Sequence, residues 1–302
     1  NMQRVMELFH YFGAPDTVLY EAHAHIGSDK LPSIIKRMRE CIIAHGGEIH
    51  FNTCVKSLKE VQSTKETFPI ILAIGHSAHD TYRMLQCEGV ALETKWFAMG
   101  VRAEHPQELI NKLMYHNNRI EYVGNASYSL VTQVDGRGVY SFCMCPGGHM
   151  VPAGSTLRSC VVNGMSASHR NSPFANSGIV VQINPEDIPG DDPLRGLAYQ
   201  EALETLAYQE AMQCMNNQES KENAAPAQRL RDFVEGKPSH TLPNCSYLPG
   251  ILPSRLDQWL PAHIGKRLQQ GFRDFDRKYP GFLTNDAIIV GVESRSSSAV
   301  RI

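Results

Sequence analysis

A helix followed at once by two strand-like segments is the feature that most constrains the fold of this 302-residue chain. Residues 32–45 begin with a proline, which suits the first turn of a helix, and apolar side chains then recur at steps of three and four. His45-Gly46-Gly47 ends the helix, since glycine accepts the left-handed conformation common at a helix C-terminus. Residues 48–53 alternate like a half-buried strand, and residues 68–74 are apolar throughout, which is typical of a strand covered on both faces. This order predicts an α/β architecture with a partly parallel sheet.

From Trp96 onward, short apolar segments alternate with glycine, proline or asparagine, and this spacing predicts an antiparallel sheet or half-barrel. The expected strands are 97–103, 129–134, 139–144, 159–164, 179–183 and 287–293. The expected helices are 80–86, 194–215, 227–235 and 261–275, with a polar loop at 216–223 and a proline-rich connector at 238–253. The hexapeptide LAYQEA occurs at 197–202 and again at 206–211. Because nine residues are about two and a half helical turns, the copies should face opposite sides and form no common surface.

Charge and composition exclude several classes of protein. Twenty-nine basic and 31 acidic side chains give a net charge of −2, which leaves no electrostatic footprint for nucleic acid or an anionic membrane. The longest apolar run is far shorter than the ~20 residues that cross a bilayer. Eight cysteines are scattered through the chain rather than packed into a short framework, which indicates reduced thiols and a cytoplasmic location.

The turn Gly75-His76-Ser77 directly follows the apolar run and is the most informative local signal. Ligands of open α/β sheets bind at the carboxyl ends of strands, and a glycine there lets the backbone approach a flat cofactor closely. A buried strand that ends in glycine is also common without any ligand, so the turn by itself leaves both interpretations open.

Two other clusters carry residues with possible chemistry. His23 and His25 with Asp29 could share a metal ion, although they do not match the HxHxDH pattern of metallo-β-lactamase-like hydrolases; the alternative is a plain loop before the helix. In Cys143-Met144-Cys145-Pro146-Gly147-Gly148-His149, a thiolate beside backbone amides and a histidine could be nucleophilic or redox-active. The alternative is ordinary packing at a strand end followed by a demanding turn.

Six segments together resemble the bacterial FAD-dependent dehydrogenase family, whose mostly uncharacterised members are glutathione-reductase-type flavoproteins with an interrupted FAD domain. The segments cover nearly the whole chain in the family's order: 25–55, 71–85, 100–110, 138–151, 225–233 and 291–302. The resemblance implies an α/β fold with an inserted α+β domain. Residues 1–95 would form part of a Rossmann-like FAD-binding domain. Residues 96–302 would form an antiparallel-sheet domain on the substrate side, with a C-terminal strand returning toward the FAD domain.

The resemblance also implies where the cofactor would lie. The residue after strand 48–53 would contact the adenine, the 73–77 turn would approach the cofactor, and the CPGG turn and the 293–301 stretch would approach the flavin or substrate. The implied contacts are Val55, Ala73, Ile74, Gly75, His76, Ser77, Pro146, Gly147, Gly148, Ser296 and Arg301. If the site needs a proton donor or a redox thiol, the candidates are His76, Cys145 and His149.

The chain contains neither GxGxxG nor GxxxxGK[ST], so the family's glycine-rich pyrophosphate loop is missing. Its C-terminal glycine-rich segment is missing as well. We therefore expect a central fragment of a longer protein, inactive alone and without FAD, because no helix N-terminus is left for the pyrophosphate. Strands 48–53 and 69–74 would lack parallel neighbours and are expected to pair with each other or with a second chain.

Three functions follow from these patterns. The leading hypothesis is a fragment of an FAD-dependent oxidoreductase, a dehydrogenase of unknown small-molecule substrate, with NAD(P)H as a candidate electron donor. The alternative is a non-enzymatic module, derived from a flavoprotein, that binds a ligand or partner. The third is a metal-dependent hydrolase built on His23 and His25. No nucleic-acid or membrane partner is expected.

Overall fold

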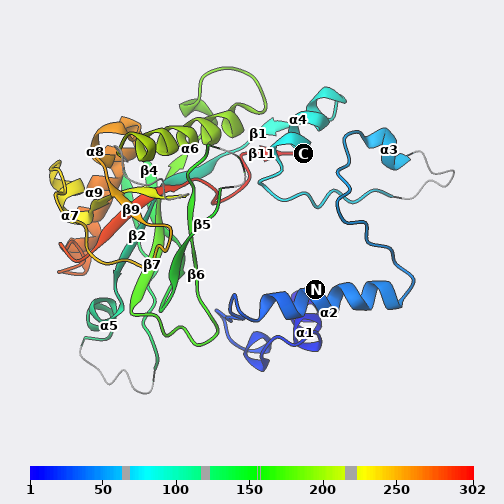
Figure 1. Cartoon of the computed structure of the whole chain (residues 1–302), viewed down its shortest axis with the longest axis horizontal. Helices are drawn as coiled ribbons and strands as arrows, with labels where there is room; N and C mark the ends of the chain where they lie inside the picture. The colour runs from blue at the N-terminus through cyan, green and yellow to red at the C-terminus, as the bar shows by residue number, and fades with distance from the viewer. Residues whose placement is uncertain (63–68, 117–122, 155, 157, 215–222) are drawn as a thin grey trace.

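The central strand β2 (Phe97–Pro106) has an apolar face and a polar face, and these two faces organise the molecule. Phe97, Met99, Val101 and Ala103 alternate into the main apolar core, whereas Arg102 and Glu104 share the other face and are buried as well. The structure is a computed structural model that describes residues 1–302 except 63–68, 117–122, 155, 157 and 215–222 (Figure 1). Its element order makes it an α/β fold with one mixed sheet and small antiparallel sheets.

Seven of the described strands form the main sheet in the order β3-β4-β7-β2-β10-β8-β9. All neighbours are antiparallel except β8 and β9, which are parallel. β5 pairs with β6, and β1 pairs with β11. The strands are β1 Glu93–Thr94, β2 Phe97–Pro106, β3 Val131–Val134, β4 Arg137–Cys145, β5 His149–Pro152, β6 Val162–Met165, β7 Phe174–Ile183, β8 Ala225–Arg229, β9 Ile251–Pro253, β10 Ile288–Glu293 and β11 Val300–Arg301.

Helices and a hairpin cover the main sheet. α9 packs on β2, β3, β4 and β7, the β5–β6 hairpin packs on the sheet centre, and α6 packs over β8, β9 and β10. The α-helices are α1 Met2–Tyr11, α2 Leu31–Ala44, α3 Leu58–Gln62, α4 His79–Cys87, α5 Gln107–Tyr115, α6 Arg195–Cys214, α7 Leu230–Glu235, α8 Leu256–Trp259 and α9 Ala262–Lys278. Short 3-10 helices lie at Asp16–Leu19 and Pro185–Asp187. Among the helices that the structure describes, none is both long and apolar enough to span a bilayer.

Most of the helices and strands expected from the sequence are confirmed. The expected antiparallel sheet is present, α2, α4, α6 and α9 lie where helices were expected, and the hairpin strand β5 was missed. In α6, Gln200 is buried while Gln209 is exposed, so the two LAYQEA copies do face different surroundings. The expected helix at 227–235 is only α7, because residues 225–229 instead form β8 between β10 and β9. The expected polar loop at 216–223 lies, apart from residue 223, outside the described residues.

The two strands expected at 48–53 and 69–74 are absent from the described structure, and this prediction was wrong; Phe68 lies outside the described residues. A strand forms only when another strand supplies hydrogen-bond partners, and no described strand pairs with either segment. Their apolar side chains are consequently in solvent: Ile71 is 87% exposed and Phe51 65%. Figure 1 shows the chain between α2 and α3 running away from the sheet, while α1 and α2 pack together through Ile34, Phe9 and Phe12.

Candidate functional site

Two of the segments that the sequence singled out meet beside the N-terminal end of α4. The Tyr82 hydroxyl donates a 3.4 Å hydrogen bond to the Gly75 carbonyl and lies 3.1 Å from the Ser298 hydroxyl. Ile74 packs near Tyr82, Leu197 and Val300 in a small apolar cluster. We name residues 75–79 and 294–298, with the α6 carboxylates that bind them, the His76 junction.

Side chains one turn apart on α6 hold the 294–298 side of the junction. Gln200 donates a 2.8 Å hydrogen bond to the Ser294 carbonyl. The Glu204 carboxylate accepts from the Ser294 hydroxyl at 2.6 Å and from Arg295 at 2.9 and 3.1 Å. Glu204 is only 1% exposed, so this ion pair is almost fully removed from water. The positions of Ser294 and Arg295 therefore depend on the buried ion pair between Arg295 and Glu204 and on the hydrogen bonds of Ser294 with Gln200 and Glu204.

A second carboxylate of α6 holds the other side. Glu201 lies 2.7 Å from Nδ1 of His79 and 2.5 Å from the Arg83 guanidinium. Burial tends to raise the pKa of Glu201, but the hydrogen bonds from Arg83 and His79 outweigh it and the pKa is lowered. Glu201 and Glu204 thus attach two segments more than 200 residues apart in sequence to one helix.

His76 lies in the junction with its pKa lowered. Partial burial is the main cause, and the positive charges of Arg295 and His79 add to it, while Glu204 opposes them. The imidazole is therefore neutral around neutral pH and can accept a proton or donate one from its N–H. This is the protonation state that a proton-transfer role for His76 requires.

The junction fits a flat cofactor in two respects. Gly75 has a φ of +72°, and no atom lies within 4 Å of the position that a Cβ would occupy there, so its backbone is open to a neighbour. The Ser297 hydroxyl is buried and has no hydrogen-bond partner in the structure. A buried polar group without a partner is costly, and a ligand atom could satisfy it.

The side chains of other residues implied as cofactor contacts are already engaged or exposed. Ser296 binds the backbone of Ala98, donating to its carbonyl at 2.6 Å. Arg301 lies in β11 and forms an exposed ion pair with Glu93 at 2.5 Å. Ala73 and Ser77 are exposed, and Val55 is 40% exposed on the chain between α2 and α3. Their roles toward a cofactor stay predictions.

The CPGG turn lies elsewhere and is tightly packed. The backbone N–H of Gly147 donates to Gln107 at 2.7 Å, and a Cβ at Gly147 would lie 1.8 Å from the Arg170 carbonyl. Pro146 and Gly148 are buried too, while His149 is exposed at the start of β5. Asn176 of β7 pairs with this end of β4, whereas Gln182 pairs with Ala98 near Ser296. Six strand residues, about 20 Å, thus separate the turn from the junction.

Between these two places lies a buried polar group that sequence reasoning missed, centred on Arg102. Its guanidinium is 0% exposed and donates to Asn176 at 2.9 Å, to the Glu293 carboxylate at 3.2 Å and to the Cys143 carbonyl at 2.7 Å. It also lies 3.4 Å from Sγ of Cys145 and 3.4 Å from Asn163. We name these six residues the Arg102 cluster. A Cβ at Gly164 would lie 2.0 Å from Arg102, so β6 reaches the cluster only because this position is glycine.

The Arg102 cluster adjoins the His76 junction through the backbone, since Glu293 ends β10 and Ser294 follows it. Burial raises the pKa of Glu293 to about 7, against the opposing charge and hydrogen bond of Arg102. The sequence signal for the cluster was an arginine that directly follows the apolar segment FAMGV of the expected strand. A single sequence does not show which distant residues neutralise such a charge.

His25 and Asp29, which belong to the predicted metal site, form hydrogen bonds with other groups of the protein. Nε2 of His25 lies 3.1 Å from the Ala167 carbonyl, and Asp29 accepts two 2.7 Å hydrogen bonds from Ser168. Across the residues that the structure describes, no group of three or more metal-ligating side chains is assembled. Nothing in the structure therefore supports the metal-dependent hydrolase.

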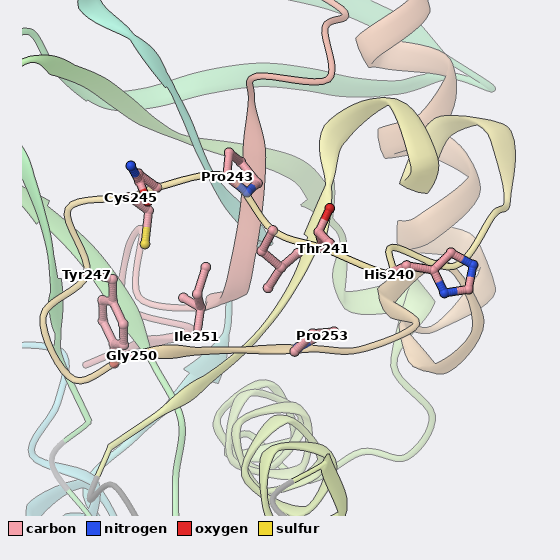
Figure 2. A pocket seen from close by; sticks show the side chains of 10 residues that line it. His240, Thr241, Pro243, Cys245, Tyr247, Gly250, Ile251 and Pro253 are labelled. Atoms are coloured by element: carbon pink, nitrogen blue, oxygen red, sulfur yellow. The ribbon is translucent and has the colours of Figure 1, made fainter.

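A pocket of about 420 Å³ lies between β9 and the loop that precedes it (Figure 2). Figure 2 shows Cys245, Pro243 and Tyr247 along the loop, facing Ile251 and Pro253 of β9. None of the residues predicted from the sequence lines it, and we assign it no ligand. The same loop is anchored by Ser246, whose backbone N–H donates to Glu104 of β2 at 2.8 Å and whose hydroxyl binds the same carboxylate.

Glu104 should make the stability of the protein depend on pH. Burial raises its pKa to about 7, although the Ser246 hydrogen bonds oppose this. The pKa of Glu104 is thus higher in the folded protein than its value of 4.5 in the unfolded chain. Its contribution to the free energy of unfolding is therefore fully present below pH 4.5 and is lost as the pH rises through 7. When the pH is raised from about 5.5 to 8, we expect the free energy of unfolding of Glu104→Gln to increase by about 2 kcal/mol relative to that of the wild type, because the amide cannot ionise. Urea unfolding at both pH values measures this, and the exposed Glu108→Gln is the control that should show no change with pH.

Comparison with known proteins identifies the family. Residues 96–296 match the family described as FAD-dependent protein, C-terminal domain-like. An uncharacterized protein of Clostridium beijerinckii (strain ATCC 51743 / NCIMB 8052) is 40% identical, and the match covers 96% of this chain and 56% of that protein. The chain thus spans little more than half the length of this relative. Because the match to the family takes in two thirds of the chain, from β2 to the Ser294–Ser296 part of the junction, the chain belongs to the FAD-dependent proteins that share this C-terminal domain.

Proposed function

We propose that this chain is part of an FAD-dependent oxidoreductase, a dehydrogenase of the glutathione-reductase type, and that the His76 junction contributes to its flavin site. The observation that carries the proposal is that two adjacent α6 carboxylates, the half-buried Glu201 and the buried Glu204, hold His79 after the open Gly75 turn and the 294–298 segment side by side. The family match supports a flavoprotein, and the bound flavin would supply the hydride and electron transfer.

The residues of the junction would bind and orient rather than react. Gly75 would let the cofactor approach the backbone, and the Ser297 hydroxyl would donate to it or accept from it. Glu204 would hold the charged Arg295 side chain in place beside the cofactor. His76, kept neutral, would hold or move a proton at an imidazole nitrogen.

We further propose that residues 1–95 belong to the FAD-binding domain and that segments 48–53 and 69–74 pair with strands outside this chain. The exposure of Phe51 and Ile71 supports this, because apolar side chains in such runs are normally covered. NAD(P)H is the electron donor that we propose to test first. All eight cysteines are free, which supports a cytoplasmic location.

The test is to purify the whole gene product that contains this chain and to measure its visible flavin absorption and released flavin. We expect about one FAD per chain in the wild type. Gly75→Val should reduce the bound flavin at least about tenfold, because a branched side chain would fill the space that the cofactor needs. A wild-type protein that holds no flavin after reconstitution with FAD would contradict the proposal and leave a non-enzymatic binding module.

The matched control is Gly236→Val at the end of α7. Gly236 has a φ of +70° and, like Gly75, no atom within 4 Å of the position that a Cβ would occupy, so valine there causes similar backbone strain. We expect Gly236→Val to keep its flavin. Equal loss of flavin in both variants would mean that strain, and not contact with the cofactor, accounts for the effect.

A further inference from the structure

Two cysteines lie at the end of β4, where the strand departs from regular pairing. The register between β4 and β7 shifts between Phe142 and Cys145, which is a bulge. Cys143 has a φ of +49°, a conformation that costs a residue with a side chain roughly 1–3 kcal/mol. Bulges and strained residues of this kind concentrate at active sites, where they redirect a side chain. Here the redirected side chain is a thiol exposed to solvent.

The second thiol is placed to react with the first. The Cys145 thiol donates a 3.4 Å hydrogen bond to the Cys143 carbonyl, and Cys145 is buried while Cys143 is exposed. Alternate residues of an extended strand are about 6.6 Å apart between Cα atoms, which is within the ~4.4–6.8 Å that a disulfide spans. A reactive thiol in solvent with a protected partner beside it is the arrangement of an attacking and a resolving cysteine.

A buried cation activates the exposed thiol. Arg102 donates to the Cys143 carbonyl and lies 3.4 Å from Sγ of Cys145. The neighbouring Cys145 side chain lowers the pKa of Cys143 to about 6, with help from Arg102 and against burial, while the pKa of Cys145 is raised. The other titratable groups that face the pair are Glu293 and Tyr128. Cys143 is thus a thiolate at neutral pH, while Cys145 keeps its proton until exchange begins.

We propose that Cys143 and Cys145 are a redox dithiol that reduces a low-molecular-weight disulfide by thiol–disulfide exchange. The Cys143 thiolate attacks one sulfur of the substrate R–S–S–R, the S–S bond breaks, and one R–S⁻ leaves. Cys145 then gives its proton to solvent and attacks Sγ of Cys143, releasing the second R–S⁻ and forming the Cys143–Cys145 disulfide. The substrate gains two electrons and the cysteine pair loses two. This activity goes beyond the proposed flavin site and does not depend on it.

The test uses the full chain with Cys54 and Cys87 replaced by serine, since these are the other exposed cysteines. Incubation with oxidised glutathione should remove two free thiols and two hydrogen atoms of mass from this protein. In the same background, Cys145→Ser should stop at a glutathione adduct on Cys143, and Cys143→Ser should form neither product. Alkylation of Cys143 by iodoacetamide should reach half its maximal rate near pH 6 rather than near the ~8.5 of an ordinary thiol.

The outcomes separate redox chemistry from packing. The proposal is wrong if oxidised glutathione leaves both thiols free in the protein that contains Cys143 and Cys145. It is also wrong if glutathione stays attached to Cys143 in that protein. Because Cys143 is exposed, Cys143→Ser should fold, and its unfolding curve checks this before the exchange is measured. Flavin content plays no part in these measurements, so failure here and failure of the proposed flavin site can be told apart.

Discussion

Arg102→Met should lower the free energy of unfolding by about 3–5 kcal/mol, the loss typical of a buried ion pair that keeps only one partner. The guanidinium is completely buried and binds a carboxylate, two amide oxygens and a backbone carbonyl. Methionine fills similar space but donates no hydrogen bond, so the buried Glu293 carboxylate and the Asn176 amide oxygen lose the guanidinium as their donor. The loss should be smaller at pH 6 than at pH 8. Without Arg102 the pKa of Glu293 rises further above 7, so its carboxyl accepts a proton more readily at the lower pH.

Urea unfolding measures this effect, and two further variants show its origin. Arg137→Met removes an arginine whose pairing with Asp187 is partly exposed, at about one fifth of each side chain, and should cost about 1 kcal/mol or less. Arg102→Met combined with Glu293→Leu should recover part of the loss, because no unpaired charge remains buried. Equal losses in Arg102→Met and Arg137→Met would show that the Arg102 cluster is not the buried ion pair described above.

Periodicity in the sequence predicts helices and strands whose partners lie within the same chain. The apolar spacing of α2 and the apolar segment that begins β2 depend on contacts that the chain itself provides, and α2, α9 and β2 occur where they were expected. Segments 48–53 and 69–74 carry an equally clear strand pattern, but a pattern cannot supply the neighbouring strand. β8 shows the opposite case, since Ala, Gln and Arg favour a helix and its pairing with β10 overrides that preference.

The candidate site was predictable only as separate segments. Gly75-His76-Ser77 and the 293–301 stretch were identified, whereas the residues that join them, Glu201 and Glu204, are ordinary members of a helix in the sequence. Likewise, the sequence around Cys143 and Cys145 is typical of ordinary packing at a strand end. Only the structure shows that Arg102 lies beside them. Charged residues that interact in the folded protein are often far apart in the sequence, and the sequence alone does not show that they are in contact.

The second large effect is expected at Glu204, whose replacement tests this connection. Glu204→Ala removes the carboxylate that binds Arg295 and Ser294, and with it the acidic half of an ion pair in which the Arg295 side chain is only 7% exposed. We expect a loss of about 3–5 kcal/mol in the free energy of unfolding. Glu210→Ala is the matched control on the same helix, and it should change stability by about 0.5 kcal/mol or less.

In the whole gene product, the same substitution should also release flavin, because the 294–298 segment keeps only the Gln200 hydrogen bond to α6 while Glu201 still holds His79. The bound flavin should fall well below that of the Glu210→Ala protein under conditions in which both remain folded. Combining Glu204→Ala with Arg295→Met should restore stability in part but should not restore flavin, since the segment would still lack its hydrogen bonds to α6 through Glu204. Flavin retained at the wild-type level in folded Glu204→Ala protein would show that the junction only supports the fold and that the cofactor is bound elsewhere.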